Sequence, residues 1–123
     1  MITIDPQSPV PLNDQIKAGV KGLVTKGQLR PGDALLSIRA LAEQLLVNPN
    51  TVARAYRELS HEGFLESRRG EGNFISESAR RNARDGLEVV RERLNDALRQ
   101  ARAGGLGWNE IDKQLNKAKG EEK

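Results

Sequence analysis

The chain has no cysteine among its 123 residues and a single histidine, His61. The absence of cysteine excludes disulfide bonds and thiolate chemistry, which fits a reducing compartment such as the cytoplasm. Without cysteine or a cluster of histidines, a transition-metal site has little support. The sequence also contains no nucleophile–base pair and no phosphate-cradling loop. We therefore expect neither an enzyme nor a bound metal or cofactor.

Aromatic residues are also scarce, at 3% of the chain, and hydrophobic residues make up 37%. Because this composition builds only a modest core, we expect oligomerisation to add buried apolar surface. No apolar run is long enough to span a bilayer. The first residues have neither the basic start nor the apolar run of a secretory signal peptide. These absences favour a cytoplasmic protein with no membrane partner.

Charge of either sign is not in large excess, since the formal net charge is +3. If the protein binds nucleic acid, locally placed arginines must do so, because no part of the chain is a polycation. The carboxylates Glu88, Glu92 and Asp96 recur at i, i+4 spacing. That spacing is more typical of a solvated helix face than of a catalytic or metal-binding cluster.

Apolar residues recur with helical spacing in three segments of the first 76 residues. The first segment is 12–29, with Gly27 near its end, where a left-handed cap is common. A turn at residues 30–33 follows. Ser37 is the expected N-cap of a second helix, and Asn48, followed by a proline, is the expected N-cap of a third helix that Gly63 ends.

Two short strands are expected next, at Phe64–Ser67 and Asn73–Ser76, around a loop that contains two arginines and two glycines. The resulting order is helix, helix, turn, helix and hairpin, which is that of a winged helix-turn-helix. The predicted fold class is therefore mainly α with a small β-hairpin. Residues 1–76 would form a DNA-binding domain, and residues 77–123 a short two-helix dimerisation region.

A helix is expected over residues 82–103, with an apolar seam at alternating spacings of three and four residues. Glycines at 104, 105 and 107 would end it, and a second helix would follow from Trp108. Trp108 either packs against the long helix as a core anchor or lines a small cleft between two subunits. The residues expected to mediate dimerisation are Leu87, Val90, Leu94, Ala97, Leu98, Ala101, Trp108, Ile111 and Leu115.

The third helix is expected to enter the DNA major groove, because the second helix of a helix-turn-helix presents its N-terminal residues to base edges. The arginines and glycines of the hairpin tip would approach the minor groove or the flanking backbone, which positions the protein more than it specifies sequence. The candidate DNA-binding residues are Arg39, Asn50, Thr51, Arg54, Arg57, Arg68, Arg69, Gly70 and Gly72, and the family resemblance described next adds Ser37.

The runs VNPNTVARAYREL and GFLESRRGEGNFI, together with GQLRPGDALLSIRALAEQL upstream, closely resemble the GntR family of bacterial repressors. The wording NPNTV and the short two-helix tail resemble its YtrA subfamily. The resemblance implies that Ser37, Arg39, Thr51, Arg54 and a wing glycine face DNA. It also implies that the tail serves dimerisation, and that the protein controls its own gene and nearby transporter genes.

The sequence departs from the family pattern at several positions. The family often has glycine where Leu46 stands, between the second and third helices, and a positive φ there would be costly for leucine. The family often has proline at position 36 and tyrosine at position 13, and some relatives have arginine near position 49. The base preference of those relatives therefore does not transfer to this chain.

Three classes of function remain open from the residues. The first is a dimeric regulator, a repressor, that binds a pseudo-palindromic operator in double-stranded DNA. The second is an architectural or replication-type winged helix that binds duplex with little sequence specificity. The third is a protein-interaction adaptor that uses the same helix face. The two tail helices cannot enclose a typical metabolite within one subunit. A small cleft between two subunits could still bind one, so whether the protein has a small-molecule effector stays open.

Overall fold

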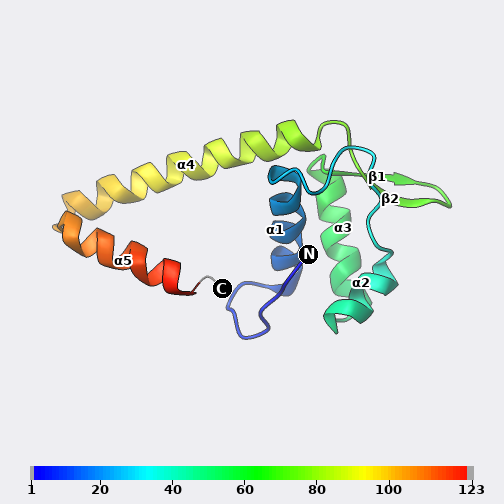
Figure 1. The fold of residues 1–123 in the computed structure, drawn as a ribbon, viewed down its shortest axis with the longest axis horizontal. Coiled ribbons are helices and arrows are strands. Elements are labelled where there is room, and N and C mark those ends of the chain that lie inside the picture. Colours follow the sequence, from blue (N-terminus) through cyan, green and yellow to red (C-terminus); the bar gives the residue numbers. More distant parts are fainter. Residues whose placement is uncertain (1, 122–123) are drawn as a thin grey trace. The chain divides into compact units, whose positions relative to one another are not determined.

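The computed structural model describes residues 2–121, so Met1, Glu122 and Lys123 at the ends of the two predicted regions lie outside the described residues. The element order is α1 (Leu12–Thr25), α2 (Ile38–Leu45), α3 (Pro49–His61), β1 (Leu65–Arg68), β2 (Gly72–Ile75), α4 (Ala79–Ala103) and α5 (Trp108–Glu121) (Figure 1). The chain divides into two compact units between Gly86 and Leu87. Within residues 2–121, no helix combines the length and apolarity that crossing a membrane requires.

The first helix, α1, forms because Ile16, Val20 and Val24 repeat every four residues and place one apolar face against the core. It ends at Thr25, earlier than the predicted end at residue 29. The reason is Gly27, whose φ of 77° turns the chain back so that the next two amides donate to the carbonyl of Leu23. The predicted left-handed cap near Gly27 is thus confirmed.

Two side-chain caps define the helix-turn-helix, and both were predicted. The Ser37 hydroxyl accepts a hydrogen bond from the amide of Ala40 at 3.1 Å, which starts α2. The Asn48 side chain accepts from the amide of Asn50 at 2.8 Å, and the proline that follows occupies the first turn of α3. Between the helices, Leu46 adopts φ 58° and ψ 48°, the left-handed conformation in which leucine is strained.

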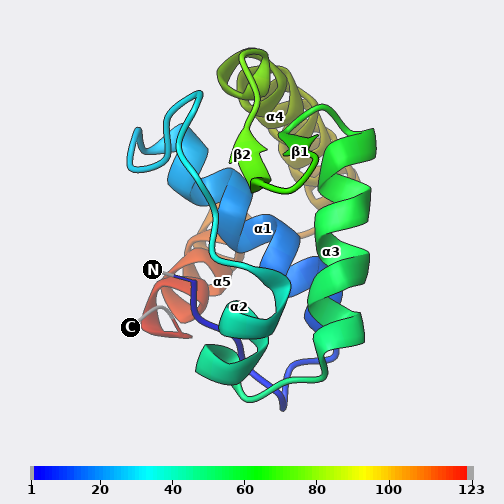
Figure 2. The ribbon, with the colours of Figure 1, turned by 90° about the vertical axis from the view of Figure 1, so that its right-hand side faces the viewer.

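The core of the N-terminal unit lies between α1, α2 and α3, and Figure 2 shows α2 at one end of α3 and the hairpin at the other. The apolar stripe of α3 is buried, as its spacing predicts. Part of the predicted lead-in also contributes, because Ile2 packs against Gly19. A Cβ at Gly19 would lie 3.0 Å from Ile2, so this glycine permits a close approach. The buried residues of α3 are Val52, Ala55, Tyr56 and Leu59.

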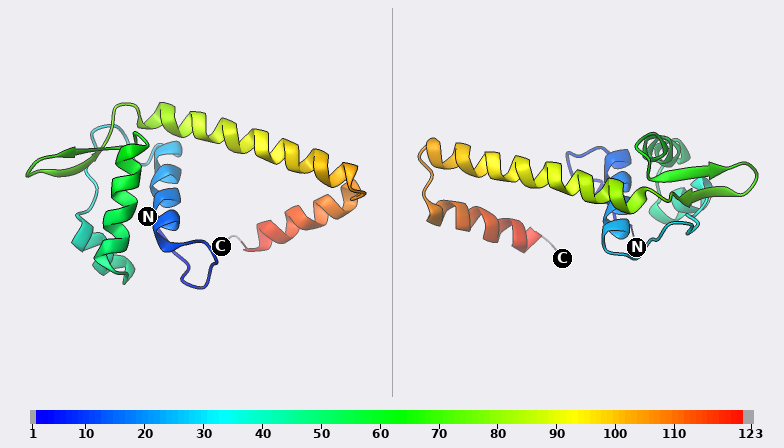
Figure 3. Two further views of the ribbon diagram at one scale, coloured as in Figure 1. Left: turned by 180° about the vertical axis from the view of Figure 1, so that it is seen from behind. Right: turned by 90° about the horizontal axis from the view of Figure 1, so that it is seen from above.

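The hairpin is present, but both predicted strands are displaced by one residue. The strands pair in antiparallel register from Leu65↔Ile75 to Arg68↔Gly72. Phe64 is not part of β1 because its amide donates to the carbonyl of Leu59 at 2.9 Å and completes the end of α3. Arg68 is the last residue of β1. Figure 3 shows the hairpin projecting beyond the helices of the N-terminal unit.

The segment before α2 anchors the hairpin, which sequence patterns did not predict. Ala34 forms an isolated antiparallel bridge with Phe74 of β2. The amide of Leu35 donates to the carbonyl of Asn73 at 2.9 Å, and the amide of Ile75 donates to the carbonyl of Asp33 at 2.8 Å. These long-range hydrogen bonds tie the wing to the start of the helix-turn-helix.

The long helix α4 begins at Ala79, earlier than the predicted residue 82, because Ala79 and Ala83 are buried against the N-terminal core. The carbonyl of Gly63 accepts hydrogen bonds from the Ser76 hydroxyl at 2.5 Å and from the Asn82 amide group at 2.9 Å. The first two turns of α4 therefore belong to the N-terminal unit, which extends beyond the predicted boundary at Ser76.

The C-terminal unit consists of the rest of α4 and of α5, and Figure 3 shows α5 running back from the end of α4. The reversal occurs at Gly105, which has a φ of 105°, and the amide of Leu106 donates to the carbonyl of Ala101 at 2.9 Å. No residue of α5 from Trp108 to Glu121 is buried. This unit therefore presents its apolar residues without a core of its own.

Candidate nucleic-acid interface

The recognition helix α3 has one buried face and one polar face. Its apolar stripe packs against α1 and α2, so the residues between the stripe positions face outward. Asn50, Arg54 and Arg57 are exposed and Thr51 is half-buried. The structure thus brings four predicted DNA-contacting residues together on one helix surface. An exposed surface of this size and polarity suits the major groove, which admits an α-helix.

The start of α2 contributes two further predicted residues, both exposed. Ser37 already uses its hydroxyl oxygen to cap α2 through the amide of Ala40. Its hydroxyl proton remains available to donate to a phosphate oxygen, so capping and DNA contact are compatible. Arg39 lies in the first turn of α2 and extends into solvent.

The wing carries the other predicted residues in two distinct environments. The guanidinium of Arg68 lies 4.0 Å from the ring centre of Phe74, and its Nε donates to Glu66 at 3.0 Å. Arg68 therefore lies along the ribbon and is held there. Arg69 and Gly70 form the exposed tip, where Gly70 has a φ of 77° and Gly72 follows with a φ of 110°. Glycine adopts these conformations without strain.

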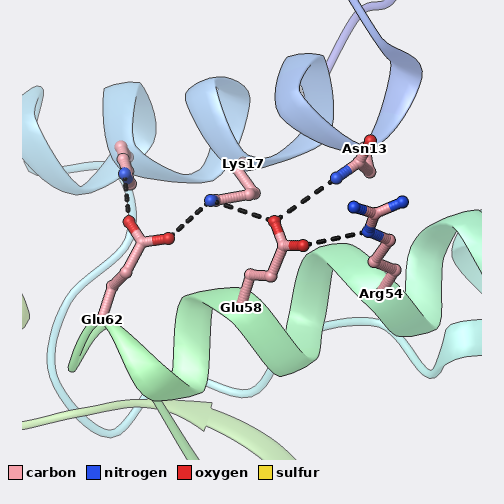
Figure 4. A network of polar contacts seen from close by, with 6 residues as sticks. Asn13, Lys17, Arg54, Glu58 and Glu62 are labelled. Atoms are coloured by element: carbon pink, nitrogen blue, oxygen red, sulfur yellow. Dashed lines mark hydrogen bonds and ion pairs between the residues drawn. The ribbon is translucent and has the colours of Figure 1, made fainter.

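A chain of charged side chains links α3 to α1 (Figure 4). The Nε of Arg54 donates to Glu58 Oε2 at 3.0 Å, and Glu58 Oε1 accepts from Lys17 Nζ at 3.2 Å and from Asn13 Nδ2 at 3.3 Å. Lys17 Nζ also lies 2.5 Å from Glu62 Oε2. Hydrogen bonds from Arg54, and then from Lys17, lower the pKa of Glu58 below its ordinary value. Glu58 is therefore an anion at neutral pH on the edge of the candidate interface.

The arginines of the candidate interface form two groups. Arg54 and Arg68 are each paired with a glutamate, at Glu58 and Glu66. Within residues 2–121, the other three arginines of the candidate interface form no ion pair. Paired guanidinium groups have fixed orientations, whereas unpaired ones are free to follow a phosphate backbone. The unpaired arginines are Arg39, Arg57 and Arg69.

An open groove between α3 and the wing adds residues that the sequence patterns did not single out as DNA contacts. It is lined by Arg57 together with Ser60, His61, Ser67 and Asn73, among others. Arg57 and His61 are one turn apart on α3, so their helical spacing alone could have indicated that both line the same groove. The strand residues Ser67 and Asn73 face each other across the ribbon in the pairing register. Both residues lie within the predicted strands, but their position beside α3 depends on tertiary packing.

The predicted dimerisation residues lie on α4 and α5 and are largely uncovered within the described chain. Leu94 is 58% exposed and Trp108 is 57% exposed, so Trp108 is not a buried core anchor. Its ring stacks under the guanidinium of Arg102 at 4.7 Å. Val89 and Leu106 are also exposed, and the predicted seam did not include them.

Comparison with known proteins decides the family of the chain. The sequence profile of the family described as bacterial regulatory proteins, gntR family, matches residues 12–75, which span α1 through β2. The chain belongs to the GntR family. It is 42% identical over 107 residues to the HTH-type transcriptional repressor YtrA of Bacillus subtilis, covering 86% of this chain and 82% of that protein.

Two solved structures show that the similarity to GntR-family proteins extends to the three-dimensional fold. YtrA from Sulfolobus acidocaldarius, a GntR-family transcription factor, aligns with a TM-score of 0.63 at 37% identity, over 77% of this chain and 97% of that one. The DNA-binding domain of AraR in complex with operator ORX1 aligns with a TM-score of 0.54 at 25% identity, over 59% of this chain and 90% of that one. This GntR chain is a YtrA-type transcriptional regulator that binds DNA.

Proposed function

We propose that the protein is a homodimeric transcriptional repressor that binds a pseudo-palindromic operator. The observation that carries this proposal is the combination of a complete winged helix-turn-helix with an uncovered apolar surface on the neighbouring unit. One recognition helix reads half a site, and two helices about 34 Å apart read an inverted repeat.

The apolar surface supports dimerisation in energetic terms. Val90 and Leu94 are each more than half exposed, and Leu87 is 43% exposed, at successive positions of one helical stripe. Full burial of one such side chain stabilises an assembly by about 1.5–3 kcal/mol. Contiguous exposed apolar patches are uncommon on monomers and mark interaction surfaces. A second copy of the same stripe is the partner with matching shape, because heptad seams pair with each other.

The DNA-contacting residues divide by task in this proposal. Thr51 and Arg54 on the N-terminal half of α3 contact base edges in the major groove. Arg57 and the wing-tip Arg69 contact phosphates, as does Arg39 from the start of α2. The backbone at Gly70 and Gly72 approaches the sugar-phosphate chain closely, because these glycines carry no side chain. Ser37 donates its hydroxyl proton to a phosphate oxygen, Asn50 contacts the duplex at the N-terminal end of α3, and Arg68 contacts the DNA backbone beside the wing tip.

The proposal is tested by selecting bound sequences from a random duplex pool and then measuring affinity by fluorescence anisotropy. We expect an inverted repeat, with affinity for the selected site at least about 10³-fold above random duplex at fixed salt. Arg54→Ala should lower this ratio, whereas Arg69→Ala should weaken all sequences alike and reduce the salt slope by about one. Lys113→Ala removes an equal charge from α5, which carries none of the proposed DNA contacts, and should change neither. A ratio near one in the wild type would instead indicate an architectural protein.

A further inference from the structure

Glu58 is a negatively charged residue on a surface proposed to bind the negatively charged DNA backbone, so attraction between opposite charges does not explain its presence there. An anion next to the phosphate backbone weakens non-specific binding, and Glu58 is one turn from Arg54 on the recognition helix. Both of its carboxylate oxygens accept hydrogen bonds, from Arg54 on one side and from Lys17 and Asn13 of α1 on the other. Glu58 is thus held by the scaffold and in turn holds Arg54.

The contact with Glu58 fixes the orientation of the Arg54 guanidinium. Its Nε is engaged at 3.0 Å, and Figure 4 shows the dashed contact with Glu58 ending at Nε, with none drawn to the two Nη groups. A guanidinium held through Nε presents its remaining N–H groups as a fork, the geometry that matches O6 and N7 of guanine. The Arg54 side chain is 64% exposed, so this fork is available to a ligand. Without the anchor, the same side chain would be free to reach a phosphate.

We propose that Glu58 is a specificity-determining positioning residue, which directs Arg54 to a guanine edge and disfavours its contact with phosphate. This inference rests on the proposed function, in which Arg54 contacts bases. Lys17 and Asn13 take part indirectly, because they keep the Glu58 carboxylate in place from α1. The ligand chemistry is therefore a G·C pair at the major-groove position that Arg54 reaches.

The neighbouring Glu62 provides a matched control. It is the C-cap residue of α3, four residues after Glu58, and pairs with Lys17 at 2.5 Å and with Lys21 at 2.6 Å. It has no contact with Arg54 in the ion-pair network. Glu58→Gln and Glu62→Gln therefore each remove one negative charge that pairs with Lys17. Only the first weakens the anchor of Arg54, because glutamine is neutral and keeps a single acceptor oxygen for the donors on both sides.

The experiment compares both variants with the wild type on the selected operator and on random duplex at fixed salt. Glu58→Gln should lower the ratio of specific to non-specific affinity by about tenfold, the value of one well-placed bidentate base contact. Its affinity for random duplex should stay equal or rise, because a negative charge is lost. Glu62→Gln should keep the wild-type ratio. Replacing the contacted guanine by 7-deazaguanine should weaken the wild type and leave Glu58→Gln almost unaffected.

A double-mutant cycle with Arg54→Lys separates positioning from a general structural role. Lysine keeps the charge but lacks the fork, so Arg54→Lys and Glu58→Gln/Arg54→Lys should have the same ratio. Asn13→Ala removes one donor to Glu58 without altering α3 and should lower the ratio by a smaller factor. Equal ratios for Glu58→Gln and Glu62→Gln, or additive losses in the cycle, would overturn the inference. A wild type without any sequence preference would overturn the proposed function as well.

Discussion

Replacing Leu46 by glycine should stabilise the protein, although leucine is the larger and more apolar residue. Leu46 is the one residue other than glycine with a positive φ within residues 2–121, at φ 58° and ψ 48°. The left-handed conformation costs an L-residue with a Cβ about 1–2 kcal/mol. The side chain is 91% exposed, so its removal sacrifices almost no apolar burial. The position must still be left-handed, because the amide of Val47 donates to the carbonyl of Ala42 at 3.0 Å and closes the end of α2.

The expected gain is smaller than the strain itself, because glycine also increases the conformational freedom of the unfolded chain. That effect offsets about 0.4–1 kcal/mol. The net increase in the free energy of unfolding should be about 1 kcal/mol, or about 4–8 °C in Tm for a domain of this size. Urea and thermal unfolding followed by circular dichroism would measure it.

Leu46→Ala is the control for the Leu46→Gly variant, since it removes the same side chain beyond Cβ and keeps the steric conflict. It should be no more stable than the wild type. The reasoning is refuted if the alanine and glycine variants have equal unfolding free energies, because the strain at φ 58° would then contribute nothing.

Two further predictions concern assembly and pH. Leu94→Asp should convert the proposed dimer to a monomer of 13.6 kDa in sedimentation and weaken operator binding at least about tenfold, because a carboxylate would replace an apolar residue of the proposed seam. Val89→Asp, at a similarly exposed position outside the seam, should stay dimeric, and a monomeric wild type at micromolar concentration would contradict the assignment. Glu62→Gln should lower the free energy of unfolding by about 1 kcal/mol or less, because the ion pair is partly exposed. The whole of this loss should be present at neutral pH. Burial raises the pKa of Glu62, but hydrogen bonds from Lys17 and Lys21 outweigh it and lower the pKa below 4.5, so the difference should vanish as pH falls through that lowered value. A difference that persists at pH 2 would show that the pair is not its source.

Local signals in the sequence predicted the helix-turn-helix well. Ser37 and Asn48 cap helices because their short side chains accept hydrogen bonds from nearby amides, which depends on neighbouring residues alone. The left-handed turn at Gly27 was anticipated from the backbone preference of glycine, and the strained one at Leu46 from the family pattern, which often has glycine at that position. The GntR resemblance, carried by residues of this segment, was confirmed by the family match to residues 12–75.

Predictions that depend on contacts between distant residues were less accurate. The strands were displaced by one residue because the amide of Phe64 is used by the end of α3. The start of α4 was placed too late because the burial of Ala79 and Ala83 depends on the rest of the fold. Gly19 is unfavourable by helix propensity alone, whereas the structure gives it a packing role against Ile2.

The sequence by itself determined the N-caps of α2 and α3, which face of α3 is apolar, and where arginines stand on the opposite face. Those properties follow from capping, helical periodicity and backbone preference, all of which act over a few residues. Only the tertiary structure decided that Asn13 and Lys17 hold the Glu58 carboxylate. These two residues are far from Glu58 in the chain, and their contact with it depends on how α1 packs against α3. The i, i+4 spacing on α3 is enough to pair Glu58 with Arg54, whereas the support of Glu58 from α1 is a consequence of helix packing, which sequence spacing does not encode.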